Sequence, residues 1–505
     1  MEFFNRQGSP LYLYGAAAGL LFVMATAIYS ILKSPLSHVP GPWYTRYTGL
    51  VLAYHWLNGS RCEYIHQLHQ KYGPVVRVTP VEADICSVSA KQQIYAVKER
   101  YIKSSWYTRL VGGAAQAGSL SVFSTQDIDT HRRYRRLLSS PLSESSLKTV
   151  EPTIRSRVDL ALERMTEELK VRGVMDVYKW SMFMTTDVIG ELTFGQSFRM
   201  LELPLGQKSQ YIEDLQTVST VGAYRTTFPT LMRFLQNSGV PTPWHAMNRA
   251  AEAGRNIRSY AMQSLERYRR LVESGEKEVK QTLFTKVFKA EEEETMKFNE
   301  IVANAQTYIV AGSDTTAHSL TYLLWSVCKD PTIQDRLVQE VQQLPDDDNS
   351  LVDHDLWDLP YLNRVIDETL RLYTAAPAGL PRLVPPEGDT LDGYWFKGGT
   401  VVATQAYSLH RDPEIYPEPE KFDPDRWANP TRAMKDAFMP FGGGARICIG
   451  LHLAKMELRL ATALFFRRFP NARVSEMEGM CDEDMQPSIY FLLGPKGKRC
   501  LIQAE

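Results

Sequence analysis

A single cysteine stands where a glycine-rich loop runs into a helical stretch, and no other feature limits the possible folds as strongly. The loop covers residues 441–450, holds Cys448 and four glycines, and precedes the helical stretch 451–458. A thiol at a helix start meets the positive end of the helix dipole, which lowers its pKa and favours the thiolate. Glycines let the backbone pass close to a flat, bulky partner. The loop therefore predicts a thiolate that binds such a partner, with Arg446 as a cation for an acidic group on it.

Other sites that use glycine-rich loops or cysteines fit this segment poorly. A dinucleotide loop requires G-x-G-x-x-G, but Ile447 stands at the position of the third glycine. A phosphate loop requires Gly-Lys-Ser/Thr, and the segment contains no lysine. One cysteine cannot build a zinc or iron–sulfur site without partners, whereas haem iron needs only one axial ligand from the protein. A structural buried cysteine would require neither the glycines nor Arg446.

Composition excludes several classes of protein. The 505 residues contain only six cysteines, no two of them in a C-x-x-C arrangement, which argues against a disulfide scaffold or a structural zinc site. The chain has 57 Lys+Arg and 58 Asp+Glu, so its net charge of -1 shows no overall signature of nucleic-acid binding. The same cysteine usage fits a reducing compartment for the main domain. Hydrophobic residues make up 44%, enough for a large buried core.

The N-terminal segment predicts a membrane anchor. Residues 11–32 form a run of 22 residues without a charge, and a helix of that length spans about 30 Å, the thickness of a bilayer core. Positive charges gather after the run, beginning at Lys33, and only Arg6 precedes it, so the main body is expected in the cytosol. A cleaved secretory signal is the alternative, for which the run is long. We therefore expect an anchor at residues 1–33 and a catalytic domain at residues 34–505.

The rest of the chain predicts a mainly α fold with small β-sheets, an α+β class. Apolar residues recur at helical spacing between Ile154 and Leu169, with Pro152 at the expected helix start and Gly173 past its end. Residues 297–330 read as one helix about 50 Å long. Strand signals occur at residues 75–78 and 85–88, and again between 391 and 409.

Four segments together resemble the cytochrome P450 superfamily, in that family's order along the chain. The cysteine loop resembles F-x-x-G-x-R-x-C-x-G, matched at Phe441, Gly444, Arg446, Cys448 and Gly450. The other three are residues 131–135, similar to W-x-x-x-R, residues 311–315, similar to A-G-x-D/E-T, and residues 368–371, similar to E-x-x-R. The resemblance covers about residues 35–500. It implies the cytochrome P450 fold, with haem b between a long central helix and the loop and its iron bound by the Cys448 thiolate.

The resemblance also assigns roles to the remaining motifs. Asp314 and Thr315 become the acid and the alcohol that deliver protons over the distal haem face, whereas without the resemblance they read equally well as a polar pair facing solvent. Glu368 and Arg371 would close a buried structural network with Arg426. These three are expected to stabilise the fold without taking part in the chemistry.

The haem propionates are expected to bind a set of basic residues. By resemblance these are His131, Arg135, Arg382 and Arg446. The chain departs from the family pattern at His131, because the family often has tryptophan there. His131 and Arg135 keep i, i+4 spacing, so both could reach one propionate, which leaves the role of His131 open. The neighbouring basic residues 132–136 are expected to border the surface used by the electron donor.

By resemblance the chain is a membrane-bound monooxygenase of the endoplasmic reticulum, single-pass, with its catalytic domain in the cytosol. It would take electrons from NADPH through a flavoprotein reductase and oxidise a small apolar molecule. The pattern is similar to filamentous-fungal members that act on secondary metabolites, and residues 103–123 and 221–234 are expected to line the pocket. Desaturation, coupling or rearrangement stay open as outcomes. A non-enzymatic haem-binding protein is the other alternative, and the Asp314–Thr315 pair argues against it because storage of a ligand needs no proton relay.

Overall fold

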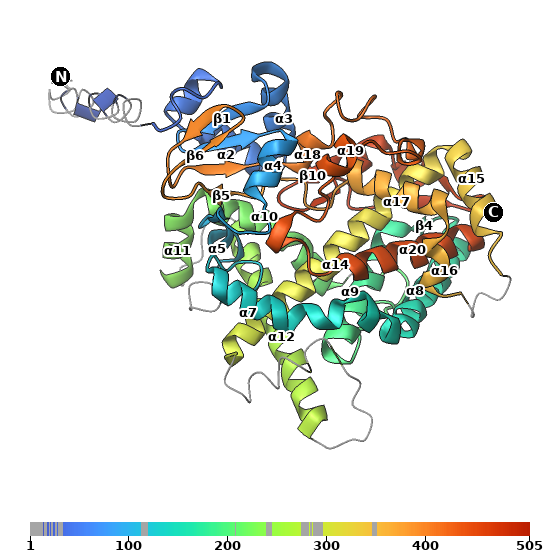
Figure 1. The fold of residues 1–505 in the computed structure, drawn as a ribbon. Helices are drawn as coiled ribbons and strands as arrows, with labels where there is room; N and C mark the ends of the chain where they lie inside the picture. The colour runs from blue at the N-terminus through green and yellow to red at the C-terminus, as the bar shows by residue number, and fades with distance from the viewer. Residues whose placement is uncertain are drawn as a thin grey trace, which may run out of the picture.

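The computed structural model describes residues 34–112, 120–207, 209–238, 245–273, 296–345 and 351–504, together with scattered single positions between 14 and 28 and at Thr282 and Thr285. Helices form the body, and small sheets gather mainly at one edge, at the upper left of Figure 1. This arrangement confirms the predicted mainly α fold with small β-sheets.

The α-helices, in chain order, are α2 (Leu50–Leu57), α3 (Arg61–Tyr72), α4 (Val88–Ile94), α5 (Trp106–Val111), α7 (Ile128–Ser139), α8 (Glu144–Arg172), α9 (Val177–Phe194), α10 (Gln210–Thr227), α11 (Pro229–Ser238), α12 (His245–Glu273), α14 (Phe298–Lys329), α15 (Pro331–Val341), α16 (Asp353–Trp357), α17 (Pro360–Leu372), α18 (Ala406–Leu409), α19 (Arg432–Ala437) and α20 (Leu451–Arg468). The short 3₁₀ helices are η1 (Trp43–Arg46), η2 (Ser140–Leu142), η4 (Pro424–Trp427), η5 (Gly444–Arg446), η6 (Met477–Gly479) and η7 (Asp482–Met485).

The strands are β1 (Val75–Thr79), β2 (Glu82–Ile85), β3 (Ile102–Lys103), β4 (Met175–Asp176), β5 (Arg382–Leu383), β6 (Asp389–Leu391), β7 (Tyr394–Phe396), β8 (Val401–Ala403), β9 (Arg473–Val474), β10 (Pro487–Ile489), β11 (Leu493–Pro495) and β12 (Leu501–Gln503). The largest sheet has five strands in the order β1-β2-β8-β5-β3. Its parallel pair β2–β8 places Ala83 opposite Val402. The sheet thereby joins the N-terminal strands to the segment after α17, and β3 and β5 bring Lys103 opposite Arg382.

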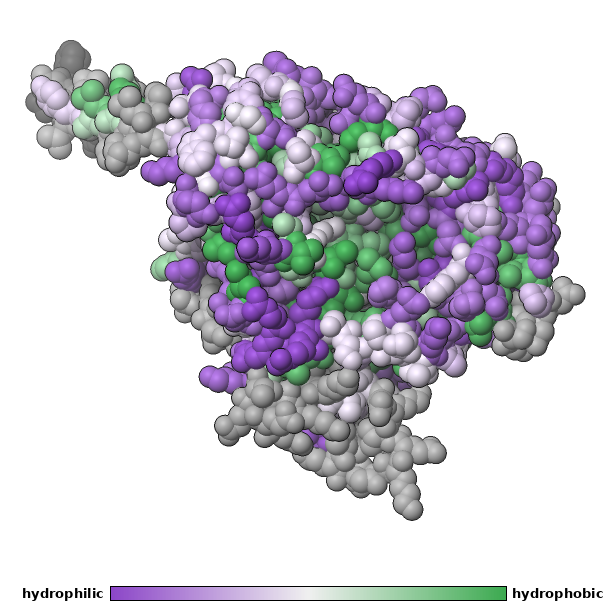
Figure 2. All heavy atoms as spheres, in the orientation of Figure 1, coloured by the Kyte–Doolittle hydropathy of each residue, from purple (hydrophilic) through white to green (hydrophobic). Residues whose placement is uncertain are grey.

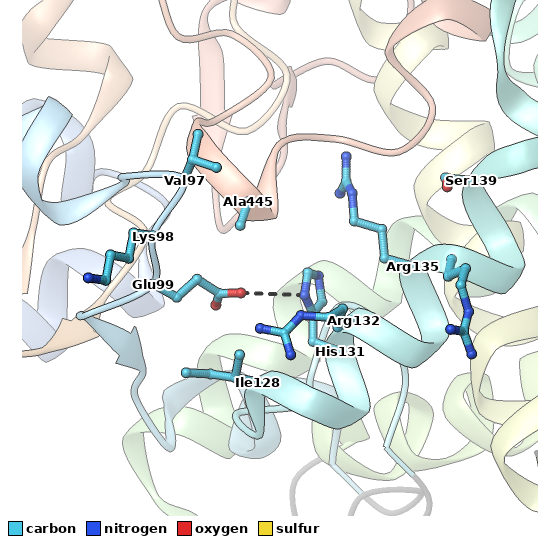
Figure 3. A pocket seen from close by; sticks show the side chains of 10 residues that line it. Val97, Lys98, Glu99, Ile128, His131, Arg132, Arg135, Ser139 and Ala445 are labelled. Carbon is cyan, nitrogen blue, oxygen red and sulfur yellow. Dashed lines mark ion pairs between the residues drawn. The ribbon is translucent and has the colours of Figure 1, made fainter.

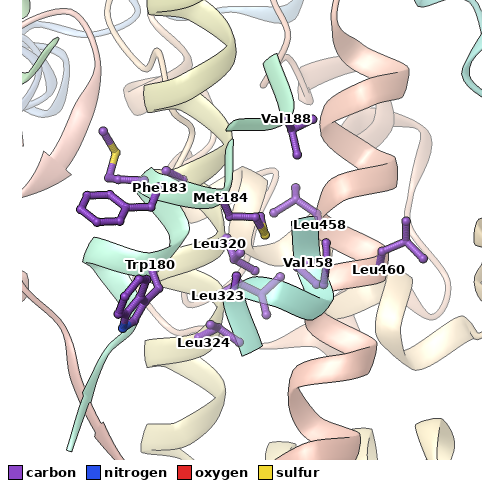
Figure 4. Packing of buried hydrophobic residues seen from close by; sticks show 14 of the residues in the cluster. Val158, Trp180, Phe183, Met184, Val188, Leu320, Leu323, Leu324, Leu458 and Leu460 are labelled. Atoms are coloured by element: carbon purple, nitrogen blue, oxygen red, sulfur yellow. The ribbon is translucent and has the colours of Figure 1, made fainter. Parts of the chain in front are cut away.

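The core is built around α14. This helix has 32 residues, about 48 Å at 1.5 Å per residue, which confirms the predicted helix that crosses the domain. Figure 4 shows Leu320, Leu323 and Leu324 of α14 packed among apolar side chains of α8, α9 and α20, including Met184 and Leu458. Because α14 is buried along most of its length, any polar side chain on it needs a partner or a function.

Two predicted element boundaries are wrong. Helix α8 does not begin at Pro152 but eight residues earlier, where Ser143 Oγ accepts the N–H of Ser146 and caps the helix. Its predicted end is confirmed, since Gly173 adopts φ +73°. The strand predicted at residues 85–88 lies three residues earlier, because β2 ends at Ile85 and Ser87 then accepts the N–H of Ala90 and starts α4. In both cases a serine cap decides the boundary.

The predicted membrane anchor at residues 1–33 falls almost wholly outside the described residues. In the parts of the chain that the structure describes, no helix is both long enough and apolar enough to cross a bilayer.

Candidate active site

The cysteine loop holds Cys448 against its own backbone just before α20. The N–H of Cys448 donates to the carbonyl of Phe441 at 2.9 Å, which closes the loop on itself. Gly442 and Gly444 have φ of +75° and +59°, and a Cβ on Gly444 would lie 2.5 Å from the carbonyl oxygen of Ala96. Only glycine fits this position. The glycines of the motif therefore set the loop geometry and its close approach to the segment after α4.

The Cys448 thiol lies deep in the protein and still has accessible surface, so it borders an internal hollow. Burial raises the pKa of Cys448, while a backbone hydrogen bond from Gly450 and the charge of Arg135 lower it. The predicted lowering of the Cys448 pKa at the helix start is therefore present, but burial raises this pKa by more. A thiolate at this place needs a cation bound to the sulfur, and a metal ion supplies one.

Three buried cations gather beside this hollow with one carboxylate among them. They are Lys103, Arg382 and Arg446. Arg446 Nε donates to Glu99 at 2.6 Å, and Arg382 Nη1 donates to the hydroxyl of Tyr107 at 2.7 Å. The Lys103 ammonium donates to the carbonyl of Phe123. Burial and the two neighbouring guanidinium groups hold the pKa of Lys103 well below its usual range.

This cluster has more positive than negative charge, and an unpaired buried charge is strongly destabilising. In addition, Arg446 Nη2 is buried without a hydrogen-bond partner among the described residues. An acidic group that enters the hollow would supply both the missing charge and the missing acceptors. The cluster therefore fits a ligand that carries carboxylates.

The basic run on α7 divides between this cluster and the surface. Arg135 Nη1 donates to the carbonyl of Ile447, next to Cys448, at 2.7 Å. Figure 3 shows His131 facing Glu99 across a pocket of about 500 Å³, with its Nδ1 at 3.7 Å from the carboxylate. Burial and the surrounding cations lower the pKa of His131 to about 3, so the ring is neutral and the contact is not an ion pair. Arg132 pairs with Asp129 at the surface.

Asp314 and Thr315 are neighbours on α14 but differ in exposure. Thr315 Oγ1 donates to the carbonyl of Ala311 at 2.7 Å and stays partly accessible. Asp314 is 2% exposed, and its Oδ1 has no partner among the described residues. Burial raises the pKa of Asp314 to about 7, and its charge acts on Tyr178 and Tyr211 of α9 and α10. The alternative prediction, that this polar pair faces solvent, is therefore wrong for Asp314.

A model of the cytochrome P450 family matches residues 39–501. The chain belongs to the cytochrome P450 family. It is 48% identical to the cytochrome P450 monooxygenase tazI of Aspergillus terreus, over 96% of each chain. It is 42% identical to the cytochrome P450 monooxygenase orf2 of Aspergillus niger over 98% of each, and 34% identical to stcB of Emericella nidulans over 95% of this chain and 90% of that one.

These comparisons identify this cytochrome P450 as a monooxygenase, and the family implies a haem-thiolate cofactor. The residues of the hollow fit that cofactor. The accessible Cys448 thiol suits a single axial ligand, and the excess of buried cations suits two propionates.

The E-x-x-R segment of this cytochrome P450 forms the predicted buried network. Glu368 accepts hydrogen bonds from Arg371 at 2.8 and 2.9 Å, from Arg426 at 2.9 Å and from the Trp427 indole at 2.9 Å. Arg371 in turn donates to the carbonyl of His410 at 2.8 Å. The network is completely buried at Glu368 and Arg371.

The same network reaches the cysteine loop. His410 Nε2 accepts the N–H of Met439 at 2.9 Å, and the carbonyl of Met439 accepts the N–H of Gly442 at 3.0 Å. Each contact is a hydrogen bond between buried or part-buried groups, so the path from α17 to the loop is stiff. The E-x-x-R motif of this enzyme therefore positions the loop that carries Cys448.

The sequence analysis missed two buried charged residues. Lys103 gave no signal as a charged site residue, because the guanidinium groups beside it, Arg382 and Arg446, come from distant parts of the chain. Glu457 of α20 is buried, and its Oε2 has no partner among the described residues. Burial raises the pKa of Glu457 to about 8, although a hydrogen bond with Thr316 lowers it in part. No signal in the sequence indicates its burial, because Lys455 and Arg459 flank it in an ordinary mixed pattern.

Proposed function

We propose that this cytochrome P450 binds haem b through the Cys448 thiolate and uses O₂ and NADPH-derived electrons to hydroxylate an apolar small molecule, an intermediate of secondary metabolism. The observation that carries the proposal is the hollow beside Cys448, which combines an accessible thiol with three buried cations that have only Glu99 as an anionic partner among the described residues. When bound, haem supplies O₂ activation, because the thiolate pushes electron density to the iron and favours O–O cleavage.

The residues of the chain would divide the remaining tasks. Arg382 and Arg446 would hold the propionates together with Lys103, because all three are buried and Arg446 has an unused donor. Arg135 and His131 line the same pocket, so they would support the same groups. His131 would act as a neutral hydrogen-bonding partner, since its lowered pKa keeps it uncharged.

Asp314 and Thr315 would move the protons that oxygen cleavage consumes. A carboxyl group with a pKa near 7 is partly protonated at neutral pH, so Asp314 can both donate and accept a proton. Thr315 Oγ1, which is partly accessible, would hold the next member of the relay by a hydrogen bond. The catalytic pair of this proposal is therefore Asp314 and Thr315.

The electrons would come from an NADPH-dependent flavoprotein reductase. Arg132 and Arg136 of α7 both line the pocket, and the Arg132 side chain is largely exposed. These positive groups would meet an acidic face of the reductase, and the association would weaken with salt. Residues 1–33 would anchor the chain in the endoplasmic reticulum membrane, with residues 34–505 in the cytosol.

The proposal is tested with purified, haem-supplemented enzyme. The ferrous carbonyl complex of the wild type should show the red-shifted Soret band of thiolate ligation, and Cys448→Ala should lose it. A variant that retains the band would refute Cys448 as the ligand. With reductase, NADPH and ¹⁸O₂, hydroxylation should place one labelled atom in the product, whereas desaturation or coupling would leave the product unlabelled.

A further inference from the structure

Near the end of α10, Arg225 is an enclosed cation for which the described residues supply no anionic partner. Its Nη1 donates to the carbonyl of Val111 at 3.2 Å, and its buried Nε has no hydrogen-bond partner among the described residues. No carboxylate of the described chain lies within 4.0 Å of the guanidinium. Burial lowers the pKa of Arg225 to about 10 with no charged neighbour to offset it, so the group still carries its charge at neutral pH.

Two glycines make the space that this guanidinium occupies. A Cβ on Gly112, at the end of α5, would lie 2.7 Å from both Nε and Cζ of Arg225. A Cβ on Gly254 of α12 would lie 3.2 Å from Nη2. Gly112 also has φ +65°, a conformation that other residues adopt only with strain. The guanidinium thus lies in a cradle that side chains at either position would fill.

The Arg225 side chain is enclosed by protein, yet part of its surface remains accessible. Figure 1 shows α5 beside α10, and α5 connects Arg225 to the haem-binding cluster. Val111, the last residue of α5, accepts the hydrogen bond from Arg225, and Tyr107, near its start, accepts the one from Arg382. With six residues, α5 is only about 9 Å long.

Aromatic side chains form an apolar wall at the other end of α5. Trp106, its first residue, contacts Phe491 with ring centroids 5.7 Å apart, and Phe491 contacts Phe123 at the same separation. Phe123 in turn packs against Tyr107 of the haem-binding cluster. An apolar aromatic wall therefore lies beside the cluster at the start of α5, and the Arg225 cation lies at the end of the same short helix.

One hydrogen bond to a neutral carbonyl does not offset the burial of a guanidinium, because a charge taken out of water needs an opposite charge or several acceptors. An uncharged side chain of similar length would fill the same cradle at lower cost. A charge kept at such a cost is typical of a binding site that is completed only by its ligand.

We propose that Arg225 is a specificity-determining residue that binds an acidic oxygen of the substrate, so that this enzyme oxidises molecules with an apolar skeleton and one anionic end. The anionic group is a carboxylate or an ionised phenol, which share the oxyanion that a guanidinium binds through paired N–H donors. This inference rests on the proposed monooxygenase function and narrows its substrate class.

The test compares ligands that differ only in the acidic group. One pair is dodecanoic acid and its methyl ester, and the other is 4-nitro-1-naphthol and its methyl ether. Binding to the purified haem-loaded enzyme is measured by isothermal titration calorimetry and by the ligand-induced change in the Soret band. We expect the wild type to bind at least one acid about tenfold or more tightly than its neutral partner, as expected for a charge-assisted hydrogen bond.

The variant Arg225→Met should abolish this preference while its affinity for the neutral ester and ether stays within about twofold, since the apolar contacts remain. Arg225→Lys should retain part of the preference. A preference for dodecanoic acid over its ester would identify the anionic group as a carboxylate, and a preference for 4-nitro-1-naphthol over its ether would identify it as a phenolate. Equal affinity of acid and neutral partner in the wild type, no detectable binding of either acid, or an unchanged preference in Arg225→Met would each overturn the inference.

A stability measurement separates this role from a structural one. Without ligand, Arg225→Met should raise the melting temperature, because it removes an unpaired charge. The matched control is Arg249→Met on α12, whose guanidinium lies 3.1 Å from Glu213 and 3.6 Å from Asp214, and which should lower it. A lower melting temperature for Arg225→Met together with an unchanged acid preference would make Arg225 a structural support for α5. Absence of the thiolate-type carbonyl band in the wild type would instead refute the proposed function.

Discussion

Replacing Asp314 by asparagine should stabilise the enzyme and at the same time slow it. In the folded state the carboxyl group is buried, one of its oxygens has no partner among the described residues, and its pKa is about 7. In the unfolded chain the same group has its ordinary pKa of 3.8. Between these values the folded state holds a proton that the unfolded state has lost, so the free energy of unfolding falls as pH rises.

The size of the effect follows from the two pKa values. At pH 5 the unpaired carboxyl group costs about 1.7 kcal/mol, and at pH 8 it costs about 4 kcal/mol, at 1.36 kcal/mol per pKa unit. Asparagine does not titrate and avoids this cost. The difference in unfolding free energy between Asp314→Asn and the wild type should therefore widen by about 2 to 3 kcal/mol from pH 5 to pH 8.

The assay is urea unfolding of the haem-loaded proteins at both pH values, followed by tryptophan fluorescence. The matched control is Asp187→Asn, because Asp187 is equally buried but accepts the N–H groups of Met200 and Leu201, both at 3.0 Å. That variant should be less stable than the wild type by about 1 to 3 kcal/mol, since its acceptors are used. A difference between Asp314→Asn and the wild type that is the same at pH 5 and pH 8 would refute the reasoning.

The same variant tests the relay. An amide neither donates nor accepts a proton as a carboxyl group does, so turnover with reductase should fall by about 100-fold or more. Product formation at the wild-type rate, in a protein that has gained stability, would show that Asp314 is dispensable for proton transfer.

Three further outcomes are expected. Thr315→Ala should raise the hydrogen peroxide released per NADPH consumed, measured with reductase present, and unchanged leakage would argue against its place in the relay. Glu368→Gln should lower the unfolding free energy by about 3 to 5 kcal/mol in urea, because Arg371 and Arg426 lose the anion that they share; a change below about 1 kcal/mol would contradict the network. Lys103→Met should release haem to apomyoglobin about tenfold faster, as expected for one lost charge-assisted hydrogen bond, and an unchanged release rate would exclude Lys103 from haem binding.

Much of the site could be predicted because its motifs are local. Glu368 and Arg371 lie three residues apart on one helix, and the glycines of the cysteine loop are set by backbone angles within a few residues. Such patterns depend on short-range geometry, which the order of residues determines. Helix α14 was predicted for the same reason, since a long apolar run with helical spacing has few alternatives.

Helix starts were predicted less well, and the cause is also local. Ser143 and Ser87 accept backbone N–H groups and begin helices where the apolar pattern alone suggested another boundary. A serine cap is a single residue with one hydrogen bond, so it is easily overlooked in the sequence, yet it sets the first residue of the helix.

The order of residues by itself determined the family, the cysteine loop, the central helix and the catalytic candidates Asp314 and Thr315. Only the tertiary structure decided how each charge is paired. Arg446 meets Glu99 from 347 positions away, Lys103 lies opposite Arg382 on a neighbouring strand, and Arg225 remains without an anion among the described residues. Burial and counter-charges depend on segments brought together by folding, and because electrostatic energy in a protein interior depends on those neighbours, neither pKa values nor unpaired charges can be read from local sequence.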